Sequence, residues 1–358
     1  MKSDILIIGT GLIGGSLGLA LKDSPLVNHI YGHDPNQAYL KTALEIGAID
    51  EITTLAFAAS QADIIFICSP LSFYKQILNE IIPFLRPNTI ITDVGSTKEK
   101  VMDLFVDLPE NVWGIGGHPM AGSEIQGISG ADQYLFENAV YLITPGKVPA
   151  KQVDRLMALI ESTGAKTKIL DAKIHDEMVA IVSHIPHLSA VALVNLTEGD
   201  SEHLSMAAGG FRDTTRIASS NPELWEDILL FNQTYILKQL DEFAAKLEGI
   251  RDSIKAGDSA KLLGILYQAK DIRDKIPQAR KGLIPSYHDV VCIVPDKPGI
   301  IGKLGRILGE KDINIVDIEI LRVREGDGGT IRLGVPNAIH ARQAADLLLN
   351  YGIKAWVR

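Results

Sequence analysis

The apolar positions follow two different periods along the chain, and the change between them marks its organisation. Through residues 1–168, short apolar runs of strand length alternate with stretches of helical period, beginning with a run at residues 4–9. Residues 169–282 show long helical periods and almost no strand pattern. Strands that alternate with helices are typical of a doubly wound sheet. We therefore expect an α/β protein, with a Rossmann-type domain at 1–168 and an all-helical substrate and dimerisation domain at 169–282.

A third pattern occupies the C-terminal residues 289–358. Apolar strand-like runs at 289–294, 313–321, 330–335 and 353–357 are separated by two amphipathic helical stretches. The resulting order βαββαβ is that of the ferredoxin-like fold. This segment is expected to form a small separate domain.

The first strand leads into a glycine-rich turn of the kind that binds a dinucleotide. Gly9, Gly11 and Gly14 have Gly-x-Gly-x-x-Gly spacing, a helical stretch follows, and the next strand pattern ends at Asp34. Gly9 allows the tight turn, Gly11 lets the backbone approach a pyrophosphate, and Gly14 lets helix and strand pack closely. Asp34 can accept hydrogen bonds from a ribose diol and would repel a 2′-phosphate. The pattern predicts NAD rather than NADP, the alternative being a glycine-rich turn without a ligand. The expected cofactor-binding residues are Gly9, Gly11, Leu12, Ile13, Gly14, Asp34, Ser69 and Pro70.

Charge and cysteine content exclude several other classes of protein. The net charge is −9, and no run of Lys or Arg suits nucleic acid. Both cysteines, Cys68 and Cys292, lie in apolar strand-like runs, which favours reduced thiols in the cytoplasm over a disulfide framework. The N-terminus does not resemble a signal peptide, and the apolar stretches are judged too short or too interrupted to span a bilayer. A cytoplasmic protein without nucleic-acid or membrane partners is expected.

Two candidate catalytic side chains follow strands at the cofactor end of the predicted sheet. His118 lies in residues 116–124 (GGHPMAGSE), where glycines let the backbone turn sharply near a ligand. Histidine is suited to proton exchange near neutral pH. Ser96 lies in the turn after another strand, beside the expected nicotinamide position. The alternative for His118 is a structural loop, and the alternative for Ser96 is a helix N-cap, a role that it can combine with the position beside the nicotinamide.

Candidate substrate-binding side chains lie in the helical part. His184 and His187 are three residues apart and share one helical face. Without a third ligand nearby they make a poor metal site, so no metal is expected. They are expected to line a substrate pocket, the alternative being hydrogen-bonded core histidines. Arg212 and Arg216, in residues 209–216 (GGFRDTTR), could bind a carboxylate from a partly buried position, the alternative being a surface Arg–Asp pair.

Together these motifs resemble the prephenate dehydrogenase family of tyrosine biosynthesis, and the resemblance extends over essentially the whole chain. The resemblance implies NAD-dependent oxidative decarboxylation of prephenate to 4-hydroxyphenylpyruvate. His118 would accept the hydrogen bond of the substrate hydroxyl, and Ser96 would orient that hydroxyl. The substrate-binding residues implied in the same way are Arg216, Arg212, His187, His184, Ser123 and Glu124.

The C-terminal segment resembles an ACT domain, which implies allosteric regulation by an amino acid, with tyrosine as the natural effector. The effector-binding residues implied are Asp296, Pro298, Gly299, Ile300 and Asn314. An ACT domain that serves only as an assembly contact is the alternative. A homodimer is also expected.

Three other functions stay open at this point. Arogenate dehydrogenase, from the same family, acts on a substrate with an amino group where prephenate has a keto group. A β-hydroxyacid dehydrogenase would use a catalytic lysine in the first long helix of the second domain, where this chain offers His184 and His187. An NAD-sensing regulatory protein would bind the dinucleotide without turnover.

Overall fold

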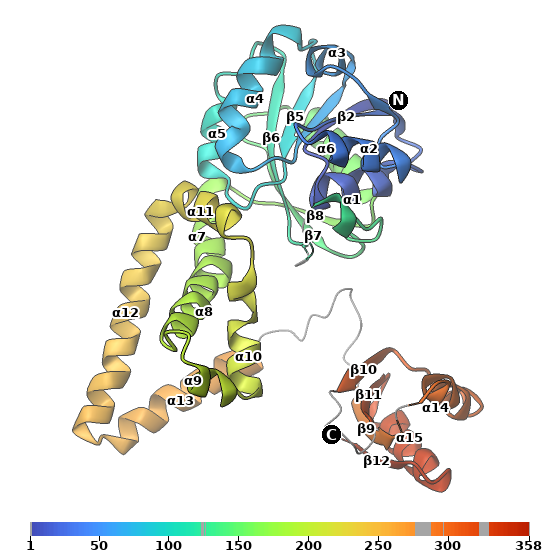
Figure 1. Ribbon diagram of the computed structural model, residues 1–358, viewed down its shortest axis with the longest axis vertical. Helices are drawn as coiled ribbons and strands as arrows, with labels where there is room; N and C mark the ends of the chain where they lie inside the picture. Colours follow the sequence, from blue (N-terminus) through green and yellow to red (C-terminus); the bar gives the residue numbers. More distant parts are fainter. Residues whose placement is uncertain are drawn as a thin grey trace. The chain divides into compact units, whose positions relative to one another are not determined.

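The chain forms two compact units, residues 1–276 and 277–358, each described by itself (Figure 1). The computed structural model describes residues 2–122, 125, 127–275, 288–295, 297–321 and 329–357.

The first unit is built on an eight-stranded sheet with the order β3-β2-β1-β4-β5-β6-β7-β8. All neighbouring strands are parallel except β6 and β7, which are antiparallel. The chain reverses its direction of winding between β1 and β4, so the predicted doubly wound Rossmann-type sheet is confirmed. The strands are β1 (Ser3–Ile8), β2 (Val27–His33), β3 (Glu51–Ile52), β4 (Ile64–Ile67), β5 (Ile90–Asp93), β6 (Trp113–Pro119), β7 (Val140–Thr144) and β8 (Lys166–Ile169).

Helices cover both faces of this sheet because its central strands are apolar on both sides. Ile5 and Ile7 of β1 face one core, which includes α1, α2 and α6. Leu6 and Ile8 face the other core, which includes α3, α4 and α5. The helices are α1 (Leu12–Leu21), α2 (Gln37–Glu45), α3 (Leu55–Gln61), α4 (Tyr74–Ile81), α5 (Glu99–Phe105) and α6 (Ala150–Glu161).

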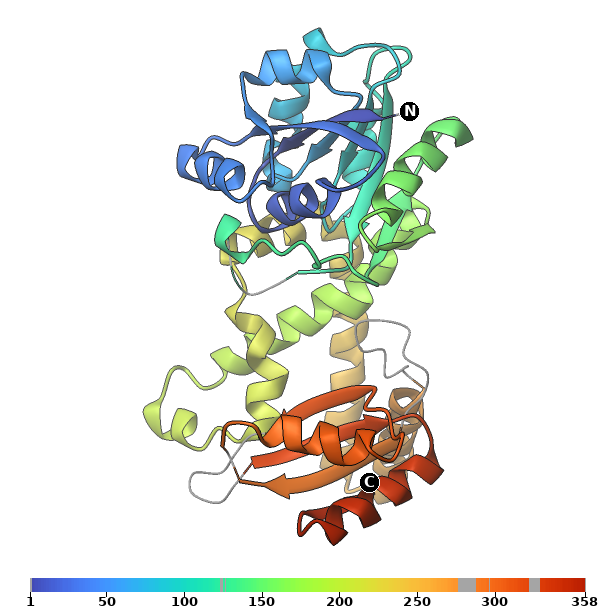
Figure 2. The ribbon, with the colours of Figure 1, turned by 90° about the vertical axis from the view of Figure 1, so that its right-hand side faces the viewer.

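The remainder of the first unit is helical, as predicted, and lies beyond one end of the sheet (Figure 2). A five-residue π-helical turn at Ala180–His184 joins α7 to α8, directly before Pro186. Proline cannot donate a backbone hydrogen bond, which accounts for the irregularity there. The helices are α7 (Ala172–Val179), α8 (Ile185–Asn195), α9 (Ser201–Ser205), α10 (Gly209–Thr215), α11 (Pro222–Phe231), α12 (Gln233–Ala256) and α13 (Ser259–Asp274).

The continuous helical segment Ala172–Asn195 is, among the described residues, long and apolar enough to cross a membrane by length and composition. The sequence analysis expected no stretch to meet that requirement. A core helix of a soluble protein passes the same test, and this segment buries the polar side chains of His175, Asp176 and His184. A single segment of this kind is weak evidence for a membrane span.

The second unit has the predicted βαββαβ order, and its four strands form an antiparallel sheet in the order β10-β11-β9-β12. The two helices and one face of the sheet share a core that includes Cys292 and Leu304. The second strand predicted for this unit, at 313–321, begins four residues later than expected, at Asp317. The elements are β9 (His288–Val294), α14 (Ile300–Gly309), β10 (Asp317–Leu321), β11 (Gly329–Val335), α15 (Ala338–Asn350) and β12 (Lys354–Val357).

We expect Gly18→Ala to lower the free energy of unfolding by about 1–3 kcal/mol, the usual cost of overpacking. A methyl group on Gly18, in α1, would lie 2.0 Å from the backbone oxygen of Ala48, so helix and loop would have to separate. Urea unfolding measures the difference. The control is Gly249→Ala in α12, where nothing lies within 4 Å of the added methyl group. Equal unfolding midpoints for the two variants would contradict the expected close contact.

Candidate active site

A cavity of about 620 Å³ opens at the carboxyl ends of β1, β4, β5 and β6. Its far wall comes from the segment that enters and forms α11, including Asn221 and Trp225. Polar and glycine-rich ends of parallel strands meet here, as expected for this sheet. The predicted residues that line it are Gly11, Leu12, Ile13, Ser69, Pro70, Ser96 and His118.

The glycine-rich turn has the geometry of a dinucleotide cradle. Gly9 has φ +96°, and a methyl group there would lie 2.7 Å from the carbonyl carbon of Cys68. A methyl group on Gly14 would lie 1.9 Å from the oxygen of Gly9, which explains why helix and turn need glycine at both positions. Gly11 faces open space and precedes α1, whose first turn has no side-chain cap. The start of α1 therefore offers its N–H groups to a pyrophosphate.

Asp34 joins this cradle to the end of β2. Its Oδ2 accepts hydrogen bonds from the backbone N–H of Thr10, at 2.7 Å, and from the Thr10 hydroxyl, at 3.3 Å, and its Oδ1 accepts one from the N–H of Asn36, at 2.8 Å. A carboxylate oxygen has two lone pairs, so Oδ1 can still accept a bond from a ribose hydroxyl. The residues present thus fit a dinucleotide without a 2′-phosphate.

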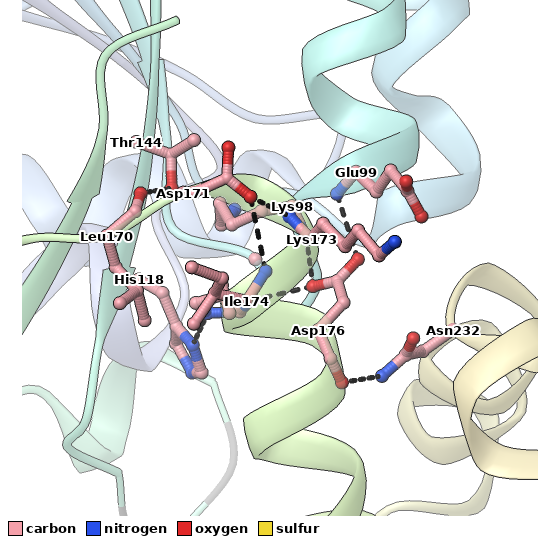
Figure 3. Close-up of polar contacts among 12 residues, drawn as sticks. Lys98, Glu99, His118, Thr144, Leu170, Asp171, Lys173, Ile174, Asp176 and Asn232 are labelled. Carbon is pink, nitrogen blue, oxygen red and sulfur yellow. Dashed lines mark hydrogen bonds and ion pairs between the residues drawn. The ribbon is translucent and has the colours of Figure 1, made fainter. Parts of the chain in front are cut away.

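His118, at the end of β6, begins a chain of three buried side chains (Figure 3). Its Nδ1 lies 2.8 Å from Nε2 of His175, and Nδ1 of His175 lies 2.7 Å from Oδ1 of Asp176. An ionised carboxylate only accepts hydrogen bonds, so His175 donates from Nδ1 and accepts at Nε2. His118 therefore donates from Nδ1, and its Nε2 carries the lone pair.

Asp176 also fixes the start of α5. Its two carboxylate oxygens accept hydrogen bonds from the backbone N–H groups of Lys98, at 2.7 Å, and Glu99, at 2.9 Å. A negative charge at a helix N-terminus is favourable because the first N–H groups have no partner within the helix. The same carboxylate thus caps α5 and orients the two histidines. Sequence reasoning missed both His175 and Asp176.

The surroundings of His118 keep its imidazole neutral. Burial lowers the pKa of His118 well below its usual 6.5, and the neighbouring His175, Lys98 and His184 lower it further. A neutral histidine with a lone pair on Nε2 can accept a proton. His118 can therefore act as a general base at neutral pH.

Ser96 lines the cavity in the turn between β5 and α5. The N-cap position of α5 belongs to Lys98, and the cap itself is supplied by Asp176 from α7. The N-cap alternative for Ser96 is therefore wrong. Its hydroxyl can therefore contact a molecule bound in the cavity.

His184 and His187 are buried but are not among the residues that line the cavity. They lie behind Trp225, which does line it. The ring of His187 stacks on the indole at a centroid distance of 3.5 Å, and the ring of His184 meets it edge-on at 5.9 Å. Nδ1 of His184 accepts a hydrogen bond from Asn232 at 3.1 Å. Burial lowers the pKa of His184 to about 4. The expectation that both histidines line the pocket is therefore wrong for this cavity, and the hydrogen bond from Asn232 agrees with the core alternative for His184.

Trp225 thus packs against two of the predicted residues, His184 and His187. Trp225 itself was not predicted from the sequence. The available signal was an aromatic side chain in the first turn of a helix that begins with Asn221 as N-cap and Pro222 as first residue.

Arg212 and Arg216 are exposed, so the expected partial burial is wrong. Arg212 lies on the short helix α10, and Arg216 begins the 3-10 turn Arg216–Ser219 that follows it. The apolar side chains of this segment do not enclose the guanidinium groups. Ser123 and Glu124 lie outside the described residues.

The expected effector residues are only partly brought together. Gly299 has φ +86° and precedes α14, where Ile300 is the first residue. Asn314 lines a separate hollow of about 460 Å³ beside Gly305 and Gly309, and neither Pro298, Gly299 nor Ile300 lines that hollow. Asp296 lies outside the described residues. No group of three metal-ligating side chains occurs in the part of the chain that the structure describes.

Three family models match the chain in succession. They are described as prephenate dehydrogenase, nucleotide-binding domain (residues 17–169), prephenate dehydrogenase, dimerization domain (171–268), and ACT domain (288–348).

Known proteins are similar over nearly the whole chain. Prephenate dehydrogenase of Bacillus subtilis is 39% identical over 93% of this chain and 92% of its own, and that of Lactococcus lactis is 35% identical over 96% and 97%. The crystal structure of Aquifex aeolicus prephenate dehydrogenase with hydroxyphenyl propionate and NAD⁺ has a TM-score of 0.72, at 31% identity over 77% of this chain and 98% of that chain. Synechocystis arogenate dehydrogenase has a TM-score of 0.67, at 33% identity over 76% and 99%. The chain therefore belongs to the prephenate dehydrogenase family.

Proposed function

We propose that the protein catalyses the NAD-dependent oxidative decarboxylation of prephenate to 4-hydroxyphenylpyruvate. The observation that carries this proposal is the neutral His118, oriented by His175 and Asp176, in the wall of a cavity that also contains the dinucleotide cradle. The relatives with this name and a structural neighbour with bound NAD⁺ support it.

In this reaction His118 removes the proton of the ring hydroxyl. The cradle from Gly9 to Gly14 and Asp34 would hold NAD, which would supply the hydride acceptor. Nε2 of His118 takes the hydroxyl proton as the carbinol carbon gives up hydride. The bond from the ring to its carboxylate then breaks, its electron pair enters the ring as CO₂ leaves, and the ring oxygen regains its proton from His118. Ser96 is proposed to orient the hydroxyl, because its side chain lines the same cavity.

The remaining pocket residues are proposed to bind the rest of the substrate. Trp225 offers a flat apolar wall for the ring, and the stacked His187 holds the indole in place. Arg216 is proposed as the partner of a substrate carboxylate, with Arg212, His184, Ser123 and Glu124 as further candidates from the sequence. An exposed guanidinium suits a long-range role in attracting a dianion.

Arogenate dehydrogenase is the second candidate, because a structural neighbour carries that activity in its name. Arogenate has an ammonium group where prephenate has a keto oxygen. A buried ammonium group needs an acceptor, usually a carboxylate. Among the described residues, no Asp or Glu lines the cavity, which favours prephenate.

A homodimer through the helical part is also proposed. α13 buries none of its side chains, and Leu266 and Tyr267 on it are each more than 60% exposed. A helix with such apolar positions is expected to be covered by another surface. The family model over this region is described as a dimerization domain, which supports a second copy as the cover.

Tyrosine is proposed as an allosteric effector that binds the ACT domain. The family model over residues 288–348 and the hollow beside Asn314 support a ligand there. A cytoplasmic location is proposed as well, because both cysteines are free, as is usual in a reducing compartment.

The first test is NADH formation by the full chain with prephenate or arogenate and with NAD⁺ or NADP⁺. We expect turnover of prephenate with NAD⁺, because Asp34 repels a 2′-phosphate and the described residues of the cavity lining include no carboxylate for an ammonium group. Turnover of arogenate alone would support the same active site but show that arogenate, and not prephenate, is the substrate. Turnover of neither would contradict the proposed function.

Substitution of His175 tests the orientation of His118. We expect His175→Phe to lower kcat by about 10–100-fold, since Nδ1 of His118 loses its acceptor and the tautomer is no longer fixed. His175→Gln is the matched control, because its amide oxygen can accept the same hydrogen bond. It should keep most of kcat. Equal losses in both variants would contradict the role of the hydrogen bond.

The pH dependence of kcat provides a second test, in which the wild type is compared with His175→Gln. His118 is competent when neutral, so activity is lost as pH falls through its pKa, which lies well below 6.5 in the wild type. His175 is one of the neighbours that lower the pKa of His118, and His175→Gln removes that influence. The acid limb of its kcat profile should therefore move to higher pH.

Inhibition by tyrosine is expected to depend on Asn314. A tyrosine molecule in the hollow beside Asn314 would inhibit without competing with prephenate, and Asn314→Ala should weaken that inhibition at least tenfold, or about 1.4 kcal/mol of binding free energy. Val316→Ala, on the same loop but away from the hollow lining, is the control. Purely competitive inhibition that both variants retain would place tyrosine at the active site instead.

A further inference from the structure

A buried ion pair lies behind the active site, and the mechanism above does not use it. Nζ of Lys98 lies 2.5 Å from Oδ2 of Asp93, and both side chains are fully buried. Burying two charges carries a large desolvation cost, so such a pair is by itself weak evidence for stability. Its contacts point to another role.

Asp93 holds the backbone next to both candidate catalytic residues. Its Oδ1 accepts a hydrogen bond from the N–H of Gly117 at 2.9 Å, one residue before His118. Its Oδ2 accepts one from the N–H of Gly95 at 2.8 Å, one residue before Ser96. A single carboxylate therefore connects the end of β6 to the turn after β5.

Lys98 connects the same carboxylate to the histidine chain. Its side chain pairs with Asp93, and its backbone N–H donates to Asp176, which orients His175. Burial lowers the pKa of Lys98, and the adjacent Asp93 opposes that shift by favouring the charged amine. Tyr74 donates a further hydrogen bond to Oδ2 of Asp93, at 3.3 Å.

The glycines before His118 make room for this pair. A methyl group on Gly116 would lie 2.9 Å from Cδ of Lys98, and one on Gly117 would lie 2.4 Å from the backbone oxygen of Asp93. From the sequence, these glycines were expected to allow a sharp turn near a ligand. In the structure they let β6 approach Asp93 and Lys98.

We propose that the Asp93–Lys98 pair is a positioning device that holds His118 and Ser96 in register with each other. The proposal rests on the proposed function, because it assigns the pair to the same reaction. Neither side chain of the pair is among the residues that line the cavity. The pair therefore acts through the backbone of Gly117 and Gly95, and its loss should affect turnover rather than binding.

The double substitution Asp93→Asn with Lys98→Met tests this role. It removes both charges, and neutral replacement of a buried pair is often tolerated by the fold. Asparagine has one acceptor oxygen and one NH₂ group, whereas N–H donors approach Asp93 from both sides. The amide must turn its NH₂ group toward either Gly117 or Gly95, so one anchor is lost.

We expect the double variant to fold and to bind NAD⁺ as the wild type does. Its kcat should fall by about 100-fold, the loss typical of a misplacement near 1 Å, while KM for prephenate changes by less than about threefold. Leu156→Ala is the control for lost stability, because it opens a cavity in the core on the opposite face of the sheet. It should lower the unfolding midpoint and leave kcat unchanged.

The outcomes separate this inference from the proposed function. A double variant with normal kcat and a lowered unfolding midpoint would show that the pair is only structural and would overturn the proposal. Failure of the proposed function would appear in the wild type, as no turnover of prephenate. In that case ¹⁵N NMR of the His118 imidazole decides: a changed Nδ1 signal in the double variant supports positioning, and an unchanged signal overturns it.

Discussion

The carboxylate of Asp176 is the contact on which the arrangement of the first unit depends. It belongs to α7, in the helical part, yet it caps α5, which follows a strand of the sheet. Asp171 starts α7 by accepting hydrogen bonds from Lys173 and Ile174, so the position of Asp176 is fixed from its own side as well (Figure 3). Because one carboxylate joins sheet and helices at the catalytic end, the orientation of His118 follows from how the two parts pack.

The buried polar side chains from His118 through His175 to Asp176 are tolerated because each is paired with the next in a definite direction. A buried hydrogen-bond chain that ends on a carboxylate can have only one arrangement of protons while its histidines are neutral. That arrangement leaves the lone pair of His118 on the nitrogen where a proton must be accepted. The site therefore obtains its base from packing and from the tautomer that the hydrogen bonds select.

The sequence predicted the parts of the site that depend on local chain geometry. Gly9, Gly11 and Gly14 are recognisable because a tight turn, a close approach and a helix contact each require glycine at a fixed spacing. Ser96 and His118 were found because they follow apolar strands of a parallel sheet. The exposed Arg212 and Arg216 were misjudged, since burial depends on what packs against a segment.

Residues whose role depends on distant partners could not be predicted in this way. His175 and Asp176 lie 57 and 77–78 residues from the groups that they contact, and nothing in their own segment marks them. Asp93 and Lys98 lie in the same short segment as Ser96, and only Ser96 was predicted from it. A lysine five residues after an aspartate is ordinary on a surface, and it becomes informative only where the structure buries both.

The glycines on each side of the sheet show how close packing and chemistry are linked. At β1 the absence of side chains brings a helix N-terminus to the expected phosphates, and at β6 it brings a strand against a buried ion pair. In both places the chain gives up side-chain packing to place backbone N–H groups accurately. Backbone groups cannot change rotamer, so they hold a geometry more firmly than side chains do. His118 can thus be supported by the residue before it, Gly117, whose N–H donates to a carboxylate that does not line the cavity.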